Sequence, residues 1–257
     1  MRIILDLPFS EYLKDPSLSS HQAMEYLKSP LRYLHNKQNP KEATNAMIVG
    51  RAVHTIILEP HKFDEEFVEM PSFSQRKADQ EAKAVFLEQC GGRQAIKASD
   101  FAMIKRIEQS FKQSDLHQEI QDYRKEVSLF FNAGGVQCKA RIDALSLDGL
   151  YFVDLKTTED PDPSRFKKEF FYYNYDFQMA FYQMAIRSVM SQSVMPTCYI
   201  FAIGKMEPIE ITKHVVFGDV MEFGMGKVNK ALEIHRQCLE TQSWPTYDPK
   251  IAHGITL

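Results

Sequence analysis

The strongest constraint on the fold is a change of hydrophobic period near Glu126. Upstream of this residue apolar positions recur at helical spacing, whereas downstream they alternate every second residue, as on a β-strand. Three alternating runs follow, EVSLFF, VQCKARIDAL and LYFVDLKTT, and the segments NAGG and SLDG separate them. Both segments contain glycine, and the Asp148-Gly149 pair is a strong hairpin signal. The pattern predicts a three-stranded antiparallel meander.

Helical patterns surround this meander. They cover about 41–59, 98–120, 174–192 and 219–241, and two short apolar runs, TCYIFAIG and PIEITKHVVF, lie between the last two helices. The helix at 41–59 is apolar almost all round, which indicates burial. The order of elements predicts the α/β class, with a mixed central β-sheet that contains the antiparallel three-stranded meander and is flanked by helices.

A chain of 257 residues is long enough to bury the core of one domain. We therefore expect a single domain over 1–257, with four parts that the patterns distinguish. These are an N-terminal helical region (1–40), a helical insertion (about 62–120), the sheet with its following helix (126–216), and a C-terminal helix with a tail (217–257). The stretch 62–90 is polar and rich in charges, which is typical of a peripheral segment.

Charge, cysteine pattern and hydropathy limit the possible classes of protein. The net charge of −3 and the pI near 6.3 neither favour nor exclude a nucleic-acid substrate, since basic residues can gather in one cleft. Four cysteines occur without a Cys-x-x-Cys pair, so we expect free thiols rather than a zinc or iron–sulfur site. The sequence shows neither the roughly 18-residue apolar run of a membrane span nor an export signal. These features predict an intracellular, cytoplasmic location.

Two charged residues interrupt the third apolar run. Because strand residues alternate between faces, Asp154 and Lys156 lie on the same face of the sheet. A two-residue turn at Asp148-Gly149 sets Asp143 of the preceding strand directly opposite Asp154, because both pairs are symmetric about the turn. Charged side chains are seldom buried without a partner, so this face must meet something polar.

The two opposed carboxylates need either a shared proton or a cation between them. Magnesium is bound by one or two carboxylates together with water and phosphate oxygens, and it polarises a phosphodiester. Lys156 is placed to orient the nucleophile or to stabilise negative charge that grows on the phosphate. The residues predict metal-assisted phosphodiester hydrolysis, and the alternative is a purely structural salt bridge between Asp154 and Lys156.

This combination of residues resembles the PD-(D/E)XK nuclease superfamily, whose core is a helix, a three-stranded meander, a second helix and a further strand. Asp143 stands at the first acidic position, and Asp154-Leu155-Lys156 stands for the (D/E)-x-K tripeptide. The opening proline of the motif is absent, because Ile142 precedes Asp143.

Two more motifs resemble the RecB-type branch of the superfamily. GRAVH is similar to its G-x-x-x-H helix motif and makes His54 a metal ligand, and FQMAFYQ is similar to its Q-x-x-x-Y motif through Gln178 and Tyr182. The N-terminal YLKSPLRYLH looks like the substrate-end helix of such nucleases. The resemblance covers about 40–205. Within this branch, VHTIILEP, DLKTTED and FYYNYDFQMAFYQ look most like the RecE (exonuclease VIII) nuclease domain of phages and prophages.

The resemblance implies a complete set of site residues. The implied catalytic residues are Asp143, Asp154, Lys156, Gln178 and Tyr182, and the implied metal ligands are His54, Asp143, Asp154 and Leu155. It also implies a metal cofactor, Mg²⁺, for which Mn²⁺ substitutes.

The implied activity is exonucleolytic digestion of linear double-stranded DNA from its ends, in the 5′→3′ direction, for phage-type recombination by single-strand annealing. The implied partners are double-stranded DNA ends, further copies of the chain in a ring-shaped trimer or tetramer, and a RecT-like annealing protein. The implied location is the cytoplasm of a bacterial or phage-infected cell. A structure- or sequence-specific endonuclease and a non-catalytic DNA-binding module remain the alternative functions.

Several residues keep a second interpretation. His54 could be a core histidine, and Gln178 with Tyr182 could form a polar helix edge. Glu126 is either an extra ligand or, as we favour, the partner of Arg141.

The stretch PSRFKKEFFYYNYDF interleaves basic and aromatic residues, which suits DNA binding as well as aromatic packing. The candidate DNA-binding residues are Arg165, Lys167 and Lys168 in this stretch, together with Arg32, which could hold a terminal phosphate.

Overall fold

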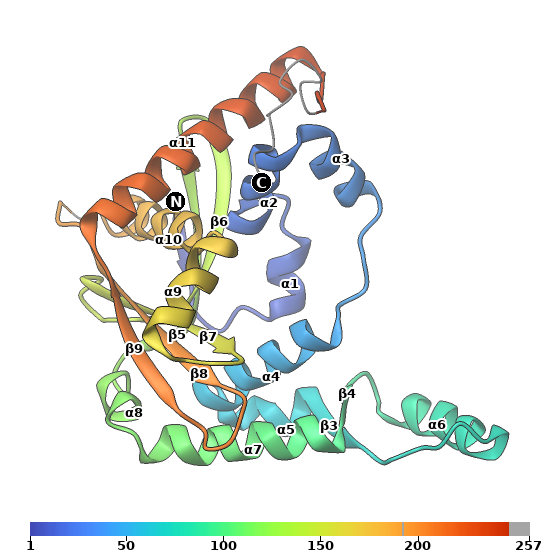
Figure 1. Cartoon of the computed structure of the whole chain (residues 1–257). Coiled ribbons are helices and arrows are strands. Elements are labelled where there is room, and N and C mark those ends of the chain that lie inside the picture. Colours follow the sequence, from blue (N-terminus) through green and yellow to red (C-terminus); the bar gives the residue numbers. More distant parts are fainter. Residues whose placement is uncertain (192, 247–257) are drawn as a thin grey trace, which may run out of the picture.

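The computed structural model describes residues 1–191 and 193–246. Its principal sheet consists of seven strands, which are β1 (Arg2–Ile4), β2 (Leu18–Ser19), β5 (Arg124–Ala133), β6 (Val136–Leu145), β7 (Tyr151–Thr158), β8 (Thr197–Gly204) and β9 (Ile211–Val216). The order in the sheet is β1-β5-β6-β7-β8-β9, and β2 lies beside β6. Helices cover both faces of this sheet (Figure 1). The predicted fold class is confirmed.

The principal helices are α1 (Phe9–Lys14), α2 (Ser20–Lys28), α3 (Pro30–Gln38), α4 (Asn45–Leu58), α7 (Ala98–Gln113), α9 (Pro163–Tyr172), α10 (Tyr175–Met190) and α11 (Gly218–Thr241). The helices at 174–192 and 219–241 lie where the sequence predicts them. The helix predicted from about residue 41 begins later, at Asn45, because the Thr44 side chain caps it by accepting the N–H of Met47.

The predicted meander is present as β5, β6 and β7, and both of its ladders are antiparallel. The β6–β7 ladder pairs Ala144 with Val153 and Leu145 with Phe152, which is the register expected from the sequence. The connecting loop is longer than the predicted two-residue turn. The N–H of Ser146 donates to the carbonyl of Tyr151 at 2.9 Å, and residues 147–150 form the loop between these two residues. Gly149 adopts a φ of 73° in this loop, as a left-handed turn position requires.

Strand β8 runs parallel to β7 and antiparallel to β9, so the sheet is mixed. A parallel neighbour needs a long crossover, and the two helices α9 and α10 provide it. Helices α10 and α11 cover one face of the sheet over a cluster that includes Phe152. Helices α4 and α7 cover the other face over a cluster that includes Val153 and Leu155 (Figure 1). Strand β7 therefore contributes core residues to both faces in alternation.

The N-terminal region predicted as helical contains two short strands that the sequence does not indicate. Strand β1 pairs antiparallel with β5, and β2 pairs parallel with β6 through Leu18 and Ser19. Runs this short carry no detectable alternation of apolar and polar residues, so pairing with the sheet alone defines them. The helical prediction for 1–40 is correct for α1, α2 and α3 and wrong for these strands.

The segment predicted as a helical insertion is only partly peripheral. It holds the short elements η1 (Pro60–Lys62), α5 (Phe63–Glu66), α6 (Lys77–Gln89) and α8 (Asp115–Glu119), and also a parallel pair of strands, β3 (Phe67–Met70) and β4 (Gln94–Lys97). Helix α6 buries no residue and projects away from the sheet (Figure 1), whereas α7 packs Ile104, Ile107 and Phe111 into the core. The strand pair was not predicted.

Some predictions concern features outside the sheet. The predicted C-terminal tail lies mostly at 247–257, outside the described residues. The four cysteines are free and buried, as the sequence predicts. Across 1–191 and 193–246, the structure contains no helix with the length and apolar character needed to cross a membrane.

Candidate active site

The candidate site lies where β6 and β7 separate. In the described ladder, β2 pairs with β6 at Cys138 and Lys139, and β7 pairs with it at Ala144 and Leu145. Asp143 therefore sits in the gap between the two partner strands. Its Oδ2 accepts the backbone N–H of Leu155 at 2.7 Å, in place of a ladder bond. The gap thus keeps a carboxylate at a strand edge where backbone pairing would otherwise continue.

His54 reaches this gap from α4. Its Nε2 lies 3.0 Å from the carbonyl oxygen of Leu155, and its Nδ1 lies 3.4 Å from Oδ2 of Asp143. The ring is bound on both sides, by a backbone oxygen and by a carboxylate, and its side chain is 26% exposed. His54 is therefore neither a core histidine surrounded by apolar groups nor a free surface residue.

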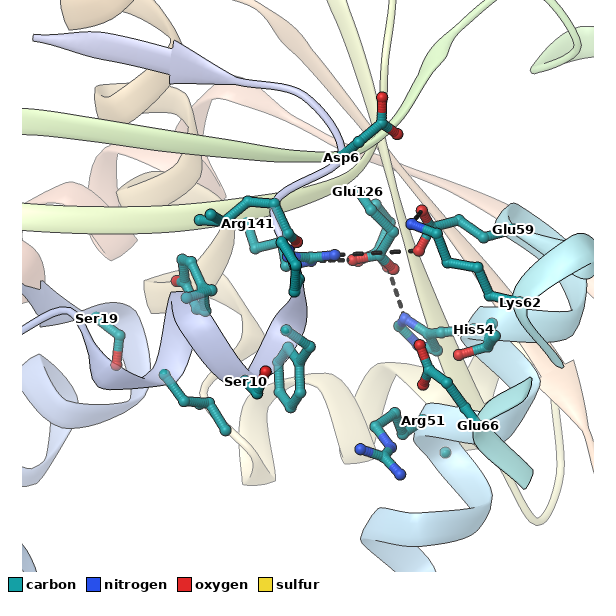
Figure 2. Close-up of a pocket in the computed structure, with 18 of the residues that line it drawn as sticks. Asp6, Ser10, Ser19, Arg51, His54, Glu59, Lys62, Glu66, Glu126 and Arg141 are labelled. Atoms are coloured by element: carbon teal, nitrogen blue, oxygen red, sulfur yellow. Dashed lines mark hydrogen bonds and ion pairs between the residues drawn. The ribbon is translucent and has the colours of Figure 1, made fainter. Parts of the chain in front are cut away.

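Glu126 approaches the same point from β5. Its neighbours Lys125 and Val127 pair with Ala144 and Ile142, so Glu126 lies across from Asp143, but it has a φ of 50°. A left-handed conformation is strained for a residue with a side chain and persists only where the surroundings enforce it. Here the kink directs the carboxylate into the site. The predicted ion pair between Glu126 and Nε of Arg141 is present (Figure 2).

His54, Glu126 and Asp143 together form a group that suits a metal ion. One ligand atom from each lies within 4.8 Å of the others. Two carboxylates and one imidazole offer the oxygen and nitrogen donors that Mn²⁺ accepts, while Mg²⁺ prefers the oxygens. The sequence set contained His54, Asp143, Asp154 and Leu155. The structure brings the first two together with Glu126 and places the Leu155 carbonyl beside His54.

Asp154 lies on the same cavity wall but makes a different contact. It is 1% exposed, and its Oδ2 forms an ion pair with Nζ of Lys156. The Lys156 ammonium also lies 4.7 Å from the ring centroid of Tyr175. The salt bridge between Asp154 and Lys156, which was the alternative interpretation of the sequence, is therefore present. Both residues line the same cavity as His54, Glu126 and Asp143.

The site contains several buried carboxyl groups, and positive charge beside them favours their ionised forms. Burial alone would lower the pKa of His54, but the Asp143 carboxylate outweighs it and raises that pKa to about 9. For Asp143, burial opposes ionisation, yet His54 and Lys156 hold its pKa below the usual value. Burial and the nearby Asp143 raise the pKa of Glu126 despite Arg141. Without a metal, the His54 imidazolium supplies the central positive charge.

Asp154 is a second site carboxyl whose burial outweighs the positive charge beside it. Its burial raises its pKa to about 6, even though Lys156 acts in the opposite direction. Burial also raises the pKa of Tyr182, and the neighbouring Asp154 and Asp143 add to this shift. The tyrosine is therefore neutral at physiological pH and can donate a hydrogen bond.

One open cavity of about 1100 Å³ is lined by the ionisable groups of the site, which are His54, Glu126, Asp143, Asp154, Lys156 and Tyr182. Figure 2 shows Glu126 and His54 pointing toward one another in it, with Arg51 and Lys62 nearby. Gln178 and Tyr182 also line it, and Gln178 Nε2 donates to the Tyr182 hydroxyl at 2.8 Å. The structure thus brings every residue predicted as catalytic to a single cavity.

The four predicted DNA-binding residues lie elsewhere. Among the described residues, Arg32, Arg165, Lys167 and Lys168 are absent from the wall of this cavity. Arg165 is exposed and pairs with Asp160 at 3.1 Å, and Lys168 lines a separate cavity. These four residues stay predictions without a geometric link to the site.

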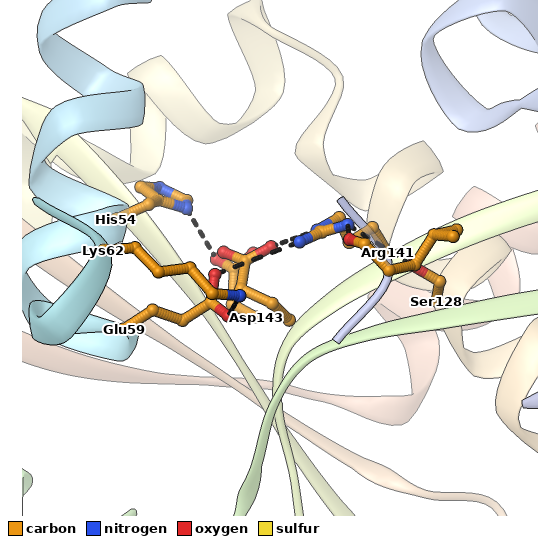
Figure 3. Close-up of polar contacts among 8 residues, drawn as sticks. His54, Glu59, Lys62, Ser128, Arg141 and Asp143 are labelled. Carbon is orange, nitrogen blue, oxygen red and sulfur yellow. Dashed lines mark hydrogen bonds and ion pairs between the residues drawn. The ribbon is translucent and has the colours of Figure 1, made fainter. Parts of the chain in front are cut away.

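Two charged residues of the site, Glu59 and Lys62, were not singled out in the sequence. Glu59 is buried at the end of α4, where it forms an ion pair with Lys62 and lies 4.0 Å from Nη2 of Arg141 (Figure 3). Arg141 also donates to the carbonyl of Leu7 at 2.8 Å. The sequence offered one signal for Glu59, which is that it is a single carboxylate between an apolar helix and Pro60.

A mixed sheet whose meander presents Asp143, Asp154 and Lys156, with a histidine from the preceding helix, defines the PD-(D/E)XK class of nuclease folds. Within that class, the chain belongs to the family described as "PDDEXK-like domain of unknown function (DUF3799)", whose model matches residues 17–253. The predicted resemblance to the superfamily is confirmed.

Solved structures also resemble the chain. One, described as "Putative exonuclease" from Eubacterium rectale, has 16% sequence identity and a TM-score of 0.69, with 100% of this chain and 95% of that chain covered. Another, described as a phage related exonuclease from Haemophilus somnus, has 13% identity and a TM-score of 0.36, with 81% and 100% covered. The first supports the fold. No curated protein matches the chain in sequence.

Proposed function

We propose that this chain is a metal-dependent exodeoxyribonuclease that digests linear double-stranded DNA from its ends, in the 5′→3′ direction. The observation that carries the proposal is the convergence of His54, Glu126 and Asp143 beside the Asp154–Lys156 pair in one open cavity. Membership of the PDDEXK-like family supports the nuclease part of the proposal. Mg²⁺ is the proposed ion, and Mn²⁺ is a proposed substitute because of the histidine.

The residues of the site divide into two roles. His54, Glu126 and Asp143 would hold the ion, which supplies positive charge that polarises the phosphodiester. In the hydrolysis the oxygen of water bonds to phosphorus and the bond from phosphorus to the bridging oxygen of the leaving group breaks. The water gives up one proton and the leaving oxygen takes up one, so the products are a phosphate monoester and a free hydroxyl. Lys156 stabilises negative charge that develops on the phosphate, and Asp154 holds the Lys156 ammonium in place. Gln178 positions the Tyr182 hydroxyl as a hydrogen-bond donor.

The experiment that tests this proposal uses end-labelled linear duplex DNA, with and without Mg²⁺, and with 5′-phosphate or 5′-hydroxyl ends. We expect Mg²⁺-dependent release of label from the linear duplex and no cutting of covalently closed circles. Cutting of closed circles would favour the alternative of an endonuclease that uses the same site. No digestion of any DNA with either Mg²⁺ or Mn²⁺ would favour the non-catalytic binding module.

The proposal includes the partners that the resemblance implies. A ring-shaped trimer or tetramer would keep the product strand enclosed and make digestion processive. The mass of the protein in solution, measured by light scattering, tests the ring. Pull-down with a RecT-like single-strand annealing protein tests the annealing partner.

A further inference from the structure

A second cavity adjoins the candidate active site, between α2 and the junction of α9 with α10. It has a volume of about 540 Å³ and shares Ser20, His21 and Gln178 with the wall of the first cavity. We call it the tyrosine groove. Its full wall consists of Ser20, His21, Met24, Lys28, Tyr172, Tyr173, Asn174, Tyr175, Phe177 and Gln178. The two cavities are therefore neighbours, and these three residues contribute to both walls.

Three consecutive aromatic residues at this junction, 171–173, are exposed to solvent. Phe166 and Phe170 of α9 are buried, whereas Phe171 is 42% exposed, Tyr172 78% and Tyr173 51%. Helix α9 ends at Tyr172, and the chain reverses through a left-handed residue before α10 begins. The adjacent rings of Tyr172 and Tyr173 therefore lie exposed at the end of α9 and in the short segment between the two helices. Contiguous exposed aromatic surface marks a binding site in many proteins.

The rings form a series that begins at the candidate active site. The Lys156 ammonium lies over the ring of Tyr175, Tyr175 stacks with Tyr173 at a centroid distance of 5.7 Å, and Tyr173 contacts Tyr172 edge-on at 4.9 Å. Each contact fixes one ring against the next, so the outer rings are positioned relative to Lys156. The series thus leads outward from Lys156 to the exposed rings of Tyr173 and Tyr172.

The charge of the groove differs from that of the site. The first cavity is rich in carboxylates, whereas the described wall of the tyrosine groove contains no aspartate or glutamate and does contain Lys28 and His21. Lys28 donates to Glu25 at 3.1 Å just outside the wall, so its charge is partly compensated. Stacking on the rings, rather than charge, is therefore the main source of affinity that this surface offers.

We propose that the tyrosine groove binds unpaired nucleotides of one DNA strand, with bases stacked on Tyr172 and Tyr173, while the same strand continues into the candidate active site. This proposal rests on the proposed function in one respect, which is that DNA is the substrate. Aromatic side chains bind successive bases without sequence preference, because every base has a π-face. The groove thus selects single-stranded ends or overhangs next to the site.

The test measures binding without digestion. The full chain is titrated, in EDTA, into a fluorescein-labelled single strand of mixed sequence and into a blunt duplex of the same sequence, and fluorescence anisotropy gives each Kd. We expect the double variant Tyr172→Ala/Tyr173→Ala to bind the single strand at least about 30-fold more weakly, since stacking is worth about 1–3 kcal/mol per base and the variant removes two rings. Binding of the blunt duplex should be unchanged.

Two variants make the test specific. Tyr172→Phe/Tyr173→Phe keeps both rings and should bind the single strand like the original protein. Tyr151→Ala removes a tyrosine that is 40% exposed on β7 and outside the groove wall, and it should have no effect on binding. Circular dichroism of every variant establishes that it is folded.

Three results would overturn the proposal. They are unchanged single-strand binding in a folded alanine variant, an equal loss in the phenylalanine variant, and a change of oligomeric state that accounts for the loss. The last result would mean that another protein surface covers the tyrosines. Because binding is measured without metal, single-strand binding that depends on the tyrosines would stand even if the protein digests no DNA. Digestion without such binding would overturn the groove alone.

Discussion

Asp143 accepts the backbone N–H of Leu155 at the point where the ladder between β6 and β7 ends. One carboxylate oxygen thus replaces a strand partner, and the same oxygen lies 3.4 Å from His54 Nδ1. The side chain has two separable functions, since a neutral acceptor could keep the hydrogen bond but could not supply the charge.

This separation predicts the behaviour of Asp143→Asn. The amide oxygen can still accept from Leu155, so we expect a folded protein. Loss of the negative charge should lower the pKa of His54 from about 9, because Asp143 is what raises it. An NMR titration of the His54 ring protons in metal-free protein measures this shift. The exposed Asp219→Asn is the control, and an unchanged His54 pKa in Asp143→Asn would contradict the assignment.

Metal affinity should depend on pH, because ligands must lose their protons. His54 has a raised pKa, so its contribution to metal-free stability is present below 6.5 and is lost as the pH rises through about 9. The pKa of Asp154 is also raised. The contribution of its protonated carboxyl to the stability of the metal-free protein is therefore present below pH 3.8 and is lost as the pH rises through about 6. The ion replaces the charge that deprotonation removes. We therefore expect tighter Mn²⁺ binding from pH 6 to pH 9, by about tenfold per unit for each proton displaced.

Calorimetry in two buffers of different ionisation enthalpy measures both the affinity and the number of protons released. His54→Gln removes the imidazole, so its residual affinity should vary less between pH 7 and pH 9 than that of the original protein. Equal pH dependence in the two proteins would show that another group titrates.

The sequence predicted the parts of the site that depend on local pattern. The period of two placed Asp154 and Lys156 on one face, and symmetry about the Asp148-Gly149 turn placed Asp143 across from Asp154 in the correct register. His54, Gln178 and Tyr182 came from the family resemblance, and the structure brings them to the same cavity. These features follow from residue spacing within single elements or across one hairpin.

The features that were missed or left open depend on contacts between distant segments. Glu126 was left open as an extra ligand, and it joins His54 and Asp143 where the backbone kinks at a φ of 50°, which strand propensity does not encode. Glu59 acquires its place through Arg141, which is distant in sequence. The exposure of Tyr172 and Tyr173 depends on where α9 ends, and element ends are poorly defined by periodicity.

Lys156→Gln should separate catalysis from folding. Removing the ammonium takes away the charge that stabilises the phosphate in the transition state, so we expect digestion of end-labelled duplex to slow by about 10²–10³-fold. Folding should be less affected, because Asp154 can accept a proton when its partner is lost. Lys213→Gln is the control and should keep full activity, since Lys213 lies on β9 and forms an ion pair with Glu119 of α8. Undiminished digestion by Lys156→Gln would refute its assigned role.

Two glycines of α11 should respond in opposite ways to alanine. A Cβ at Gly224 would lie 2.2 Å from the backbone oxygen of Asp176 on α10, so Gly224→Ala must push the two helices apart. The same contact carries an ion pair of 2.8 Å between Lys227 and the buried Asp176. Overpacking of this kind should lower the free energy of unfolding by about 1–3 kcal/mol.

Gly226 is the matched position in the same helix, since a Cβ there meets nothing within 4 Å. Gly226→Ala should raise the free energy of unfolding by about 0.5–1 kcal/mol, because alanine loses less backbone entropy in a helix than glycine does. Urea unfolding of the two variants, followed by circular dichroism, gives both values. If the two substitutions change stability in the same direction, the close approach of α11 to α10 at Gly224 is not what requires glycine there.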